Sequence, residues 1–194
     1  SLCDWSSDVC SSDLTGWSLF LDRDGVLNQR PGLGYVTQPE EFVWIDGALE
    51  AVKNLTGLFD RIIVVTNQQG IGKGIMSEEQ LLKVHKQMLV DAENAGGCID
   101  AAYFASGLRH LDAFNRKPGA GMFWQAKSEF PEIEPKKSIM VGDNFSDVMF
   151  GYRLNMVTVF ISYFNSLPYR YHYMMDYCFG SLSAFSQFLD CSKR

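Results

Sequence analysis

The feature that most constrains this chain is an apolar run that ends abruptly in two carboxylates. Residues 17–21 read as a buried strand, and the chain continues as Asp22-Arg23-Asp24-Gly25. In a parallel α/β sheet the active site lies at the carboxyl ends of the strands, so Asp22 is expected at an edge that a ligand can reach. Two acids at this spacing can share one magnesium ion while one attacks phosphorus and the other moves a proton. Taken alone, a strand followed by an Asp-Gly turn is the better explanation.

Three later segments also end in groups that suit a phosphate or a metal ion. Thr66 follows an apolar, β-branched run, and a hydroxyl with free backbone N–H groups at a strand end can hold a phosphate. Lys117, beside Arg116, offers the fixed ammonium that phosphoryl transfer uses to offset charge. Asp143 ends a further strand-like run and adds a hard oxygen ligand for Mg²⁺. Each segment also has an ordinary explanation, as a turn, a solvated basic pair or a capped helix N-terminus.

The order Asp-x-Asp, Thr, Lys and Gly-Asp-x-x-x-Asp resembles the haloacid dehalogenase-like phosphatase superfamily, over roughly residues 17–161. Within that superfamily the chain is most similar to the capless branch with heptose-bisphosphate and histidinol-phosphate phosphatases. The segments that carry this closer similarity are Asp22-Arg23-Asp24-Gly25, Gly34-Tyr35-Val36, Val65-Thr66-Asn67-Gln68-Gln69-Gly70-Ile71 and Arg116-Lys117-Pro118. The resemblance implies an α/β fold with a Rossmann-like parallel sheet, helices on both faces and no cap domain.

The resemblance also implies a role for each motif residue. Asp22 would be the nucleophile that forms an aspartyl-phosphate, and Asp24 would protonate the leaving oxygen and then activate water. Mg²⁺ would be bound by Asp22, by the backbone carbonyl of Asp24 and by Asp143. Asp147 would support the site from behind these ligands, and no role is implied for Asn144. Phosphate or substrate would be bound by Thr66, Asn67, Arg116 and Lys117.

One departure from the branch concerns the loop before Arg116. Heptose-phosphatase relatives often carry a zinc-binding loop there, with one Cys-x-His and one Cys-x-Cys pair. Residues 104–115 of this chain contain no cysteine and one histidine. A structural zinc needs about four nitrogen or sulfur ligands, so we expect no structural zinc. This loop helps to shape the substrate site in those relatives, so its different sequence here weakens the inference that this chain acts on the same substrate.

The spacing between the motifs leaves no room for a separate cap domain. Between Asp22 and Thr66, and again between Thr66 and Lys117, the expected helices, strands and loops use nearly all the residues. An uncapped site stays open, which favours extended phosphoesters over small enclosed substrates. We expect the loops 28–37 and 105–115 to line its mouth. The cations available there for a second anionic group of the substrate are Arg30, Arg109, His110 and Arg116.

The rest of the chain alternates between strand-like and helix-like periodicity. Ser77-Glu78-Glu79-Gln80 reads as a capping box that opens a helix, and Asn155 is expected in a left-handed cap position. His85, on that first helix, is expected to be a surface or packed residue and not a ligand. Ser146 and Asp147 are candidate caps of a helix that ends near residue 154. Further helices are predicted at 48–58 and 122–130, strands at 101–105 and 157–161, and a closing strand and helix from 177 to 188.

The first residues do not continue this pattern. Residues 4–14 back-translate, in one choice of codons, to part of a common short-read sequencing adapter. We therefore expect residues 1–14 to be an adapter-derived or disordered segment, and residues 15–194 to form a single domain. Either interpretation gives the first segment no role in the fold.

Composition narrows the class of partners. The net charge of −6 argues against nonspecific binding to nucleic acid or anionic membranes. No apolar run reaches the ~18 residues of a membrane span. Beyond the first segment the cysteines are Cys98, Cys178 and Cys191, an odd set without metal-ligand spacing, which is typical of reduced thiols in the cytoplasm. We expect a monomer whose partner is a small phosphorylated metabolite.

Together the motifs favour a Mg²⁺-dependent phosphomonoesterase that acts through an aspartyl-phosphate intermediate, with a sugar phosphate such as heptose bisphosphate as substrate. Histidinol phosphate and the phosphorylated ends of polynucleotides are the alternatives among enzymes. Outside enzymes, the alternative is a noncatalytic binding or scaffold protein that retained the fold. The full set of motif residues favours the enzyme, because a decayed site loses such groups first.

Overall fold

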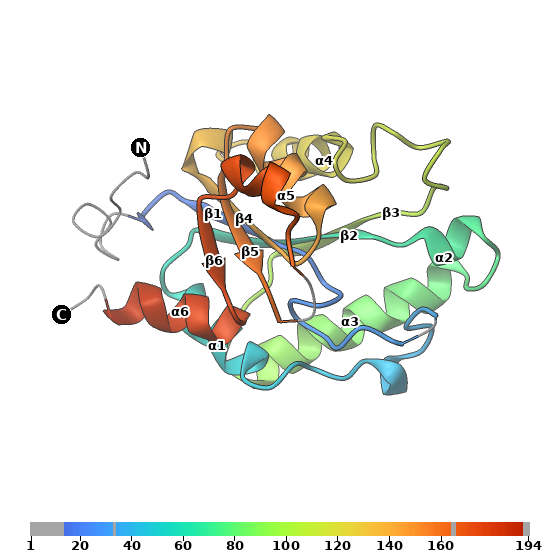
Figure 1. The fold of residues 1–194 in the computed structure, drawn as a ribbon. Helices are drawn as coiled ribbons and strands as arrows, with labels where there is room; N and C mark the ends of the chain where they lie inside the picture. Colours follow the sequence, from blue (N-terminus) through green and yellow to red (C-terminus); the bar gives the residue numbers. More distant parts are fainter. Residues whose placement is uncertain (1–13, 33, 164–165, 192–194) are drawn as a thin grey trace.

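The computed structural model describes residues 14–32, 34–163 and 166–191, and a parallel sheet of six strands forms its centre. The strands are β1 (Ser18–Leu21), β2 (Arg61–Asn67), β3 (Ala101–Ala105), β4 (Ser138–Gly142), β5 (Val157–Ile161) and β6 (Tyr177–Phe179). They lie in the order β3-β2-β1-β4-β5-β6 (Figure 1). The order reverses between β1 and β4, and in doubly wound sheets ligands bind in the crevice at such a reversal.

Helices cover both faces of this sheet (Figure 1). One face carries α1 (Ala48–Thr56), α3 (Glu78–Asn94) and α6 (Leu182–Cys191), and the other carries α4 (Gly121–Glu129) and α5 (Phe145–Arg153). Successive side chains of a strand point to opposite faces, so Leu19 and Leu21 of β1 enter the first core while Phe20 enters the second. The predicted α/β class with a Rossmann-like parallel sheet is therefore confirmed.

Short elements connect these layers. They are η2 (Pro39–Glu41), α2 (Gln69–Gly72), η3 (Pro135–Lys137) and η4 (Tyr169–Met174), none of which was predicted. Each has six residues or fewer, too few for a periodic apolar face to be visible in the sequence. Among the described residues, the segments between β1 and β2 and between β2 and Lys117 contain no cap domain.

Local backbone signals in the sequence proved reliable at two helix ends. The N–H of Gln80 donates to Ser77 Oγ at 3.1 Å and the N–H of Ser77 donates to Gln80 Oε1 at 2.8 Å, so the predicted capping box opens α3. Asn155 has φ 57°, the left-handed conformation expected after α5.

The cap of α5 differs from both predicted candidates. Asn144 is the N-cap, because its side-chain oxygen accepts from the N–H of Ser146 at 3.3 Å. Asp147 completes a capping box by accepting from the N–H of Asn144 at 3.0 Å. Asn144, to which no role was assigned, thus shapes the loop that follows β4.

Leu14 corrects the boundary predicted between the first segment and the folded domain. Its side chain is fully buried in the core on the side of the sheet that α1, α3 and α6 cover, and its carbonyl accepts from the N–H of Trp17 at 3.0 Å. The folded part of the chain therefore includes Leu14. Residues 1–13 lie outside the described residues, and the prediction for them stays a prediction. None of the helices in the described part of the chain is both long enough and apolar enough to span a membrane.

Candidate active site

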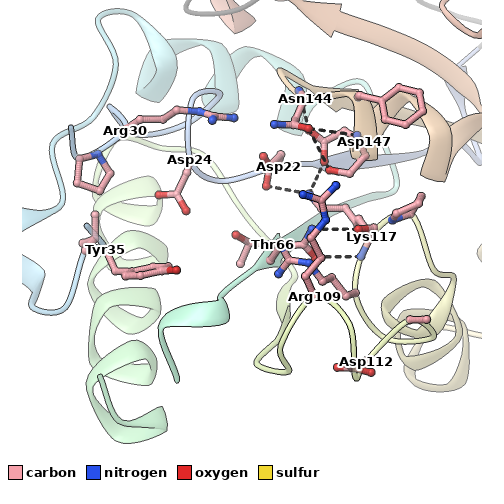
Figure 2. Close-up of a pocket in the computed structure, with 18 of the residues that line it drawn as sticks. Asp22, Asp24, Arg30, Tyr35, Thr66, Arg109, Asp112, Lys117, Asn144 and Asp147 are labelled. Carbon is pink, nitrogen blue, oxygen red and sulfur yellow. Dashed lines mark hydrogen bonds and ion pairs between the residues drawn. The ribbon is translucent and has the colours of Figure 1, made fainter. Parts of the chain in front are cut away.

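A cavity of about 590 Å³ lies at the carboxyl ends of β1, β2 and β4 (Figure 2). Residues from the two loops predicted to line its mouth do so, namely Arg30, Pro31, Gly34, Tyr35 and Val36 from the first and Arg109, Asp112 and Ala113 from the second. His110, predicted with them, is not among the lining residues. Arg153, at the end of α5, lines the cavity and was not predicted.

Asp22 and Lys117 meet at the base of this cavity. The N–H of Asp22 donates to the carbonyl of Val141 at 2.9 Å, which continues the β1–β4 ladder and fixes Asp22 at the strand end. Lys117 Nζ donates to Asp22 Oδ1 at 2.8 Å and to the carbonyl of Val65 at 2.6 Å. The same ammonium lies 2.7 Å from Asp147 Oδ1, so one buried cation bridges two buried carboxylates.

Three buried acids form a candidate cation site beside Lys117. Carboxylate oxygens of Asp22, Asp143 and Asp147 all lie within 4.8 Å of one another, and no other group of this kind occurs among the described residues. Burial, and then the charge of Asp147, raises the pKa of Asp22 to about 7 against the opposing effect of Lys117. Burial also raises the pKa of Asp143 to about 6, although Arg30 opposes the shift. Crowded oxygen ligands that repel one another suit a hard divalent cation such as Mg²⁺.

Two neighbours restrict the space around Asp143. Arg30 Nη2 lies 2.5 Å from Asp143 Oδ1, so this arginine is paired with a candidate metal ligand, whereas the sequence analysis placed it among the cations available to bind substrate. Gly25 has φ +95°, and a Cβ at this position would overlap the carboxylate of Asp143. The glycine of the Asp-x-Asp-Gly motif is therefore required by its conformation and by the close approach of an acid from another strand.

Asp24 is held apart from the acidic cluster. Arg23 Nη2 donates to both of its carboxylate oxygens, at 2.9 and 3.0 Å. Asn28 Nδ2 donates to Oδ1 at 3.0 Å, and Gln68 Nε2 donates to Oδ2 at 2.9 Å. Burial is the largest single effect and raises the pKa of Asp24, but the charge of Arg23 and these hydrogen bonds outweigh it and leave the pKa below its usual value.

The other predicted phosphate-binding residues, Thr66, Asn67 and Arg116, also line the cavity. Thr66 is buried, and its hydroxyl accepts from Gln68 Nε2 at 2.9 Å. Asn67 binds the backbone of Lys117 twice, by accepting from its N–H at 2.9 Å and by donating to its carbonyl at 3.2 Å. Arg116 lines the cavity, and its Nη1 is buried without a hydrogen-bond partner among the described residues. Asn67 thus holds the loop that delivers Lys117, a contact that sequence reasoning did not anticipate.

Sequence reasoning also missed several side chains that organise the site. Arg23 and Gln68 stand inside motifs that carried the resemblance, but nothing in their spacing showed that both would contact Asp24. His85 of α3 contacts Arg23 at 3.2 Å across 62 residues of chain. Contacts over such distances have no local sequence signal.

Comparisons with known proteins identify the family of this chain. A family model described as polynucleotide kinase 3 phosphatase matches residues 20–166. The chain is 38% identical to a D-glycero-alpha-D-manno-heptose-1,7-bisphosphate 7-phosphatase of Mycobacterium tuberculosis, over 68% of this chain and 70% of that protein. It is 37% identical to a D-glycero-beta-D-manno-heptose-1,7-bisphosphate 7-phosphatase of Pasteurella multocida, over 69% of this chain and 74% of that protein.

Solved structures show the same fold. A D,D-heptose 1,7-bisphosphate phosphatase from B. bronchiseptica, complexed with magnesium and phosphate, aligns with a TM-score of 0.78 at 23% identity and covers 90% of this chain and 98% of that one. The corresponding protein from Burkholderia thailandensis aligns with a TM-score of 0.62 at 28% identity, over 89% of this chain and 97% of that one. The chain therefore belongs to the polynucleotide kinase 3 phosphatase family of the haloacid dehalogenase-like superfamily, in the branch of the heptose 1,7-bisphosphate phosphatases.

Proposed function

We propose that this chain is a Mg²⁺-dependent phosphomonoesterase that hydrolyses a sugar bisphosphate, with a heptose 1,7-bisphosphate as the favoured substrate. The observation that carries the proposal is the meeting of Asp22 and Lys117 at the base of one cavity, with Thr66 also lining it and Asp143 buried beside Asp22. Relatives that are 37–38% identical over two thirds of the chain have this activity in their names.

The proposed reaction has two displacements at phosphorus. In the first, an oxygen of Asp22 forms a bond to phosphorus and the bond to the sugar oxygen breaks. The dianionic phosphate beside Asp24 opposes the lowering of its pKa by Arg23, so Asp24 takes up a proton from solvent when substrate binds and gives it to that oxygen. In the second, water attacks the aspartyl-phosphate, Asp24 takes a proton from the water, and the bond between phosphorus and Asp22 breaks to release phosphate. Lys117 and Thr66 hold the oxygens of the transferring phosphoryl group, and Lys117 offsets its negative charge.

Mg²⁺ would be bound by the carboxylates of Asp22 and Asp143 and by the backbone carbonyl of Asp24, and it supplies the positive charge that lets a phosphate dianion approach these acids. The crowding of Asp22, Asp143 and Asp147 supports this assignment, because their oxygens lie within 4.8 Å of one another. Asp147 would act through Lys117, with which it pairs at 2.7 Å.

The charge of the cavity supports a substrate with a second anionic group. Lys117 is engaged with two acids and Arg30 with Asp143. Arg109, Arg116 and Arg153 line the cavity as further cations. A guanidinium can bind a phosphate through two parallel hydrogen bonds, so these arginines suit a second phosphate remote from Asp22.

A second candidate function is removal of phosphate from polynucleotide ends, because the matching family is named for that class. The net charge of −6 argues against it, since binding along a nucleic-acid strand depends on neutralising its phosphates with Lys and Arg.

We also propose a cytoplasmic location, which the free and exposed thiols of Cys98 and Cys178 support.

A substrate panel tests the proposal. Phosphate release with Mg²⁺ is measured for both anomers of heptose 1,7-bisphosphate, for histidinol phosphate and for a 3′-phosphorylated oligonucleotide, and one heptose anomer is expected to have the highest kcat/KM. Asp22→Asn should abolish turnover of every substrate while the thermal melt stays cooperative. Near-normal activity of that variant would contradict the mechanism. If the oligonucleotide is the best substrate, the second candidate function, removal of phosphate from polynucleotide ends, is the correct one.

A further inference from the structure

The carboxylate of Asp24 is held by a buried arginine that has a partner of its own. Arg23 has no exposed surface, although a guanidinium keeps its charge under all ordinary conditions. Its Nη2 is directed to Asp24, as described above, and its Nη1 lies 3.2 Å from Nε2 of His85. His85 is the hydrogen-bond partner that the described residues provide for Nη1. Asp24, Arg23 and His85 thus form one chain of contacts that leads from the cavity to α3, the helix behind Asp24 and Tyr35 in Figure 2.

The chemistry of this contact fixes the state of His85. Arginine has only donors, so Nε2 of His85 must accept and the imidazole must be neutral with its proton on Nδ1. Burial, and then the charge of Arg23, lowers the pKa of His85 to about 3 although Asp24 opposes the shift, which agrees with a neutral ring. His85 is 4% exposed, and its ring lies at 71° to the ring of Phe104 with 5.9 Å between the centroids. A neutral acceptor is therefore held rigidly against the far end of the arginine.

A histidine at position 85 costs stability in a way that a role in packing alone does not explain. Nδ1 of His85 is buried and has no hydrogen-bond partner among the described residues. A buried donor without a partner destabilises the fold, and an apolar side chain of similar size would avoid this loss. What the apolar side chain would not supply is an acceptor for Nη1 of Arg23.

We propose that His85 is a positioning residue for proton transfer at Asp24 and that it acts through Arg23. This inference rests on the proposed function, in which Asp24 gives and takes the proton. His85 holds Nη1, which sets the plane of the guanidinium and keeps Nη2 on both oxygens of Asp24. Without His85, the described residues hold the guanidinium through Asp24 alone, by contacts from Nε at 3.3 Å and from Nη2. Arg23 then shifts together with the carboxyl group against Asn28 and Gln68, and Asp24 leaves the orientation in which it meets the leaving oxygen.

The test compares two substrates that differ in their need for a proton. An aryl phosphate such as 4-nitrophenyl phosphate releases a stable phenolate and needs no acid to protonate it. An alkyl phosphate, such as the best sugar phosphate of the panel, releases its alcohol only when an acid protonates the leaving oxygen. kcat/KM covers the steps up to loss of the leaving group, so it reports on Asp24 as an acid. His85→Leu removes the acceptor, and His85→Gln returns an acceptor oxygen near the position of Nε2. Val84→Ala, a fully buried neighbour on α3, is the matched control for loss of packing.

We expect His85→Leu to lower kcat/KM for the alkyl phosphate by about ten- to a hundredfold and to leave the aryl phosphate close to wild type. His85→Gln should recover most of the loss, and Val84→Ala should lower the melting temperature without changing the ratio of the two substrates. His85→Ala replaces His85→Leu if the latter does not fold.

Equal losses on both substrates, or no loss on either, overturn the positioning role while the proposed function stands. A wild-type protein that hydrolyses neither substrate, or an Asp22→Asn variant that hydrolyses both, overturns the proposed function and this inference with it.

Discussion

The ammonium group of Lys117 lies 2.8 Å from Oδ1 of Asp22, although 95 residues separate the two in the chain. The same group lies 2.7 Å from Asp147, so a single buried cation opposes the charge of a buried acidic cluster. Asn67 holds the backbone of Lys117 from the end of β2. The geometry of the site therefore depends on three strand ends and one loop that the sheet brings together.

Replacing Lys117 should damage both stability and catalysis. Lys117→Met leaves buried carboxylates without their cation, which is expected to lower the free energy of unfolding by about 3–5 kcal/mol. It should also reduce kcat by at least about a hundredfold, because the transferring phosphate loses a preorganised donor. Urea denaturation and phosphate release measure the two effects. Lys83→Met is the control, since Lys83 forms an exposed pair with Glu79 and its loss should change stability by less than about 0.5 kcal/mol. Similar results for both variants would contradict the buried role of Lys117.

Removing the guanidinium of Arg116 should affect substrates unequally. Arg116→Ala is expected to lower kcat/KM for the best bisphosphate by about tenfold or more and to spare a minimal aryl phosphate, because only the bisphosphate offers a second anion. The measurement is the ratio of kcat/KM values for the two substrates in wild type and variant. An equal loss on both would instead place Arg116 on the transferring phosphate.

Gly25 and Gly32 offer a matched pair of substitutions within one loop region. Gly25→Ala forces an unfavourable φ and drives a methyl group into the carboxylate of Asp143. We expect a loss of at least about 1–3 kcal/mol in stability and a weakened affinity for Mg²⁺. Gly32→Ala meets no atom within 4 Å and has no positive φ, so it should leave both quantities unchanged. Titration calorimetry with Mg²⁺ and thermal melts check this, and equal behaviour of the two variants would show that Asp143 does not bind the ion.

Stabilisation by Mg²⁺ should depend on pH. In the folded protein the pKa of Asp22 is raised from 3.8 to about 7, mainly by burial, so at lower pH a proton occupies the carboxylate that the ion needs. The unfolded chain has already released this proton above pH 3.8, and without the ion Asp22 therefore favours unfolding as pH rises toward 7. Mg²⁺ displaces the proton and reverses this effect. The rise in melting temperature on adding Mg²⁺ should increase from about pH 5.5 to about pH 8. Asp143→Asn should abolish most of the rise, and a rise independent of pH would refute the assignment.

A deletion and a point substitution can locate the start of the folded domain. Deletion of residues 1–13 should leave melting temperature and activity unchanged, as expected for a segment without a role in the fold. Leu14→Ala should lower the free energy of unfolding by about 2–5 kcal/mol, because Leu14 is fully buried in the core that α1, α3 and α6 cover. Loss of stability in the deletion would show that the preceding residues belong to the domain.

The pairing of Asp24 with Arg23 and His85 lies beyond what a local pattern can predict. Arg23 and Asp24 were visible in one motif, whereas His85 was expected only to be a surface or packed residue of α3. The same holds for Asn144, whose role as the cap of α5 depends on the angle at which the chain leaves β4. Arg30 was expected near the mouth of the cavity, and its pairing with Asp143 across 113 residues was not.

By itself the sequence determined the order of strands and helices, the capping box of α3, the turn at Asn155 and the set of residues at the strand ends. These features follow from periodicity and from the conformations that single residues prefer, both of which act over a few neighbouring residues. Only the tertiary structure decided which of these residues touch. Lys117 reaches Asp22, and His85 reaches Arg23, because a parallel sheet brings its strand ends to one edge while α3 packs across it. Such contacts depend on the packing of whole elements, and no short stretch of the chain encodes them.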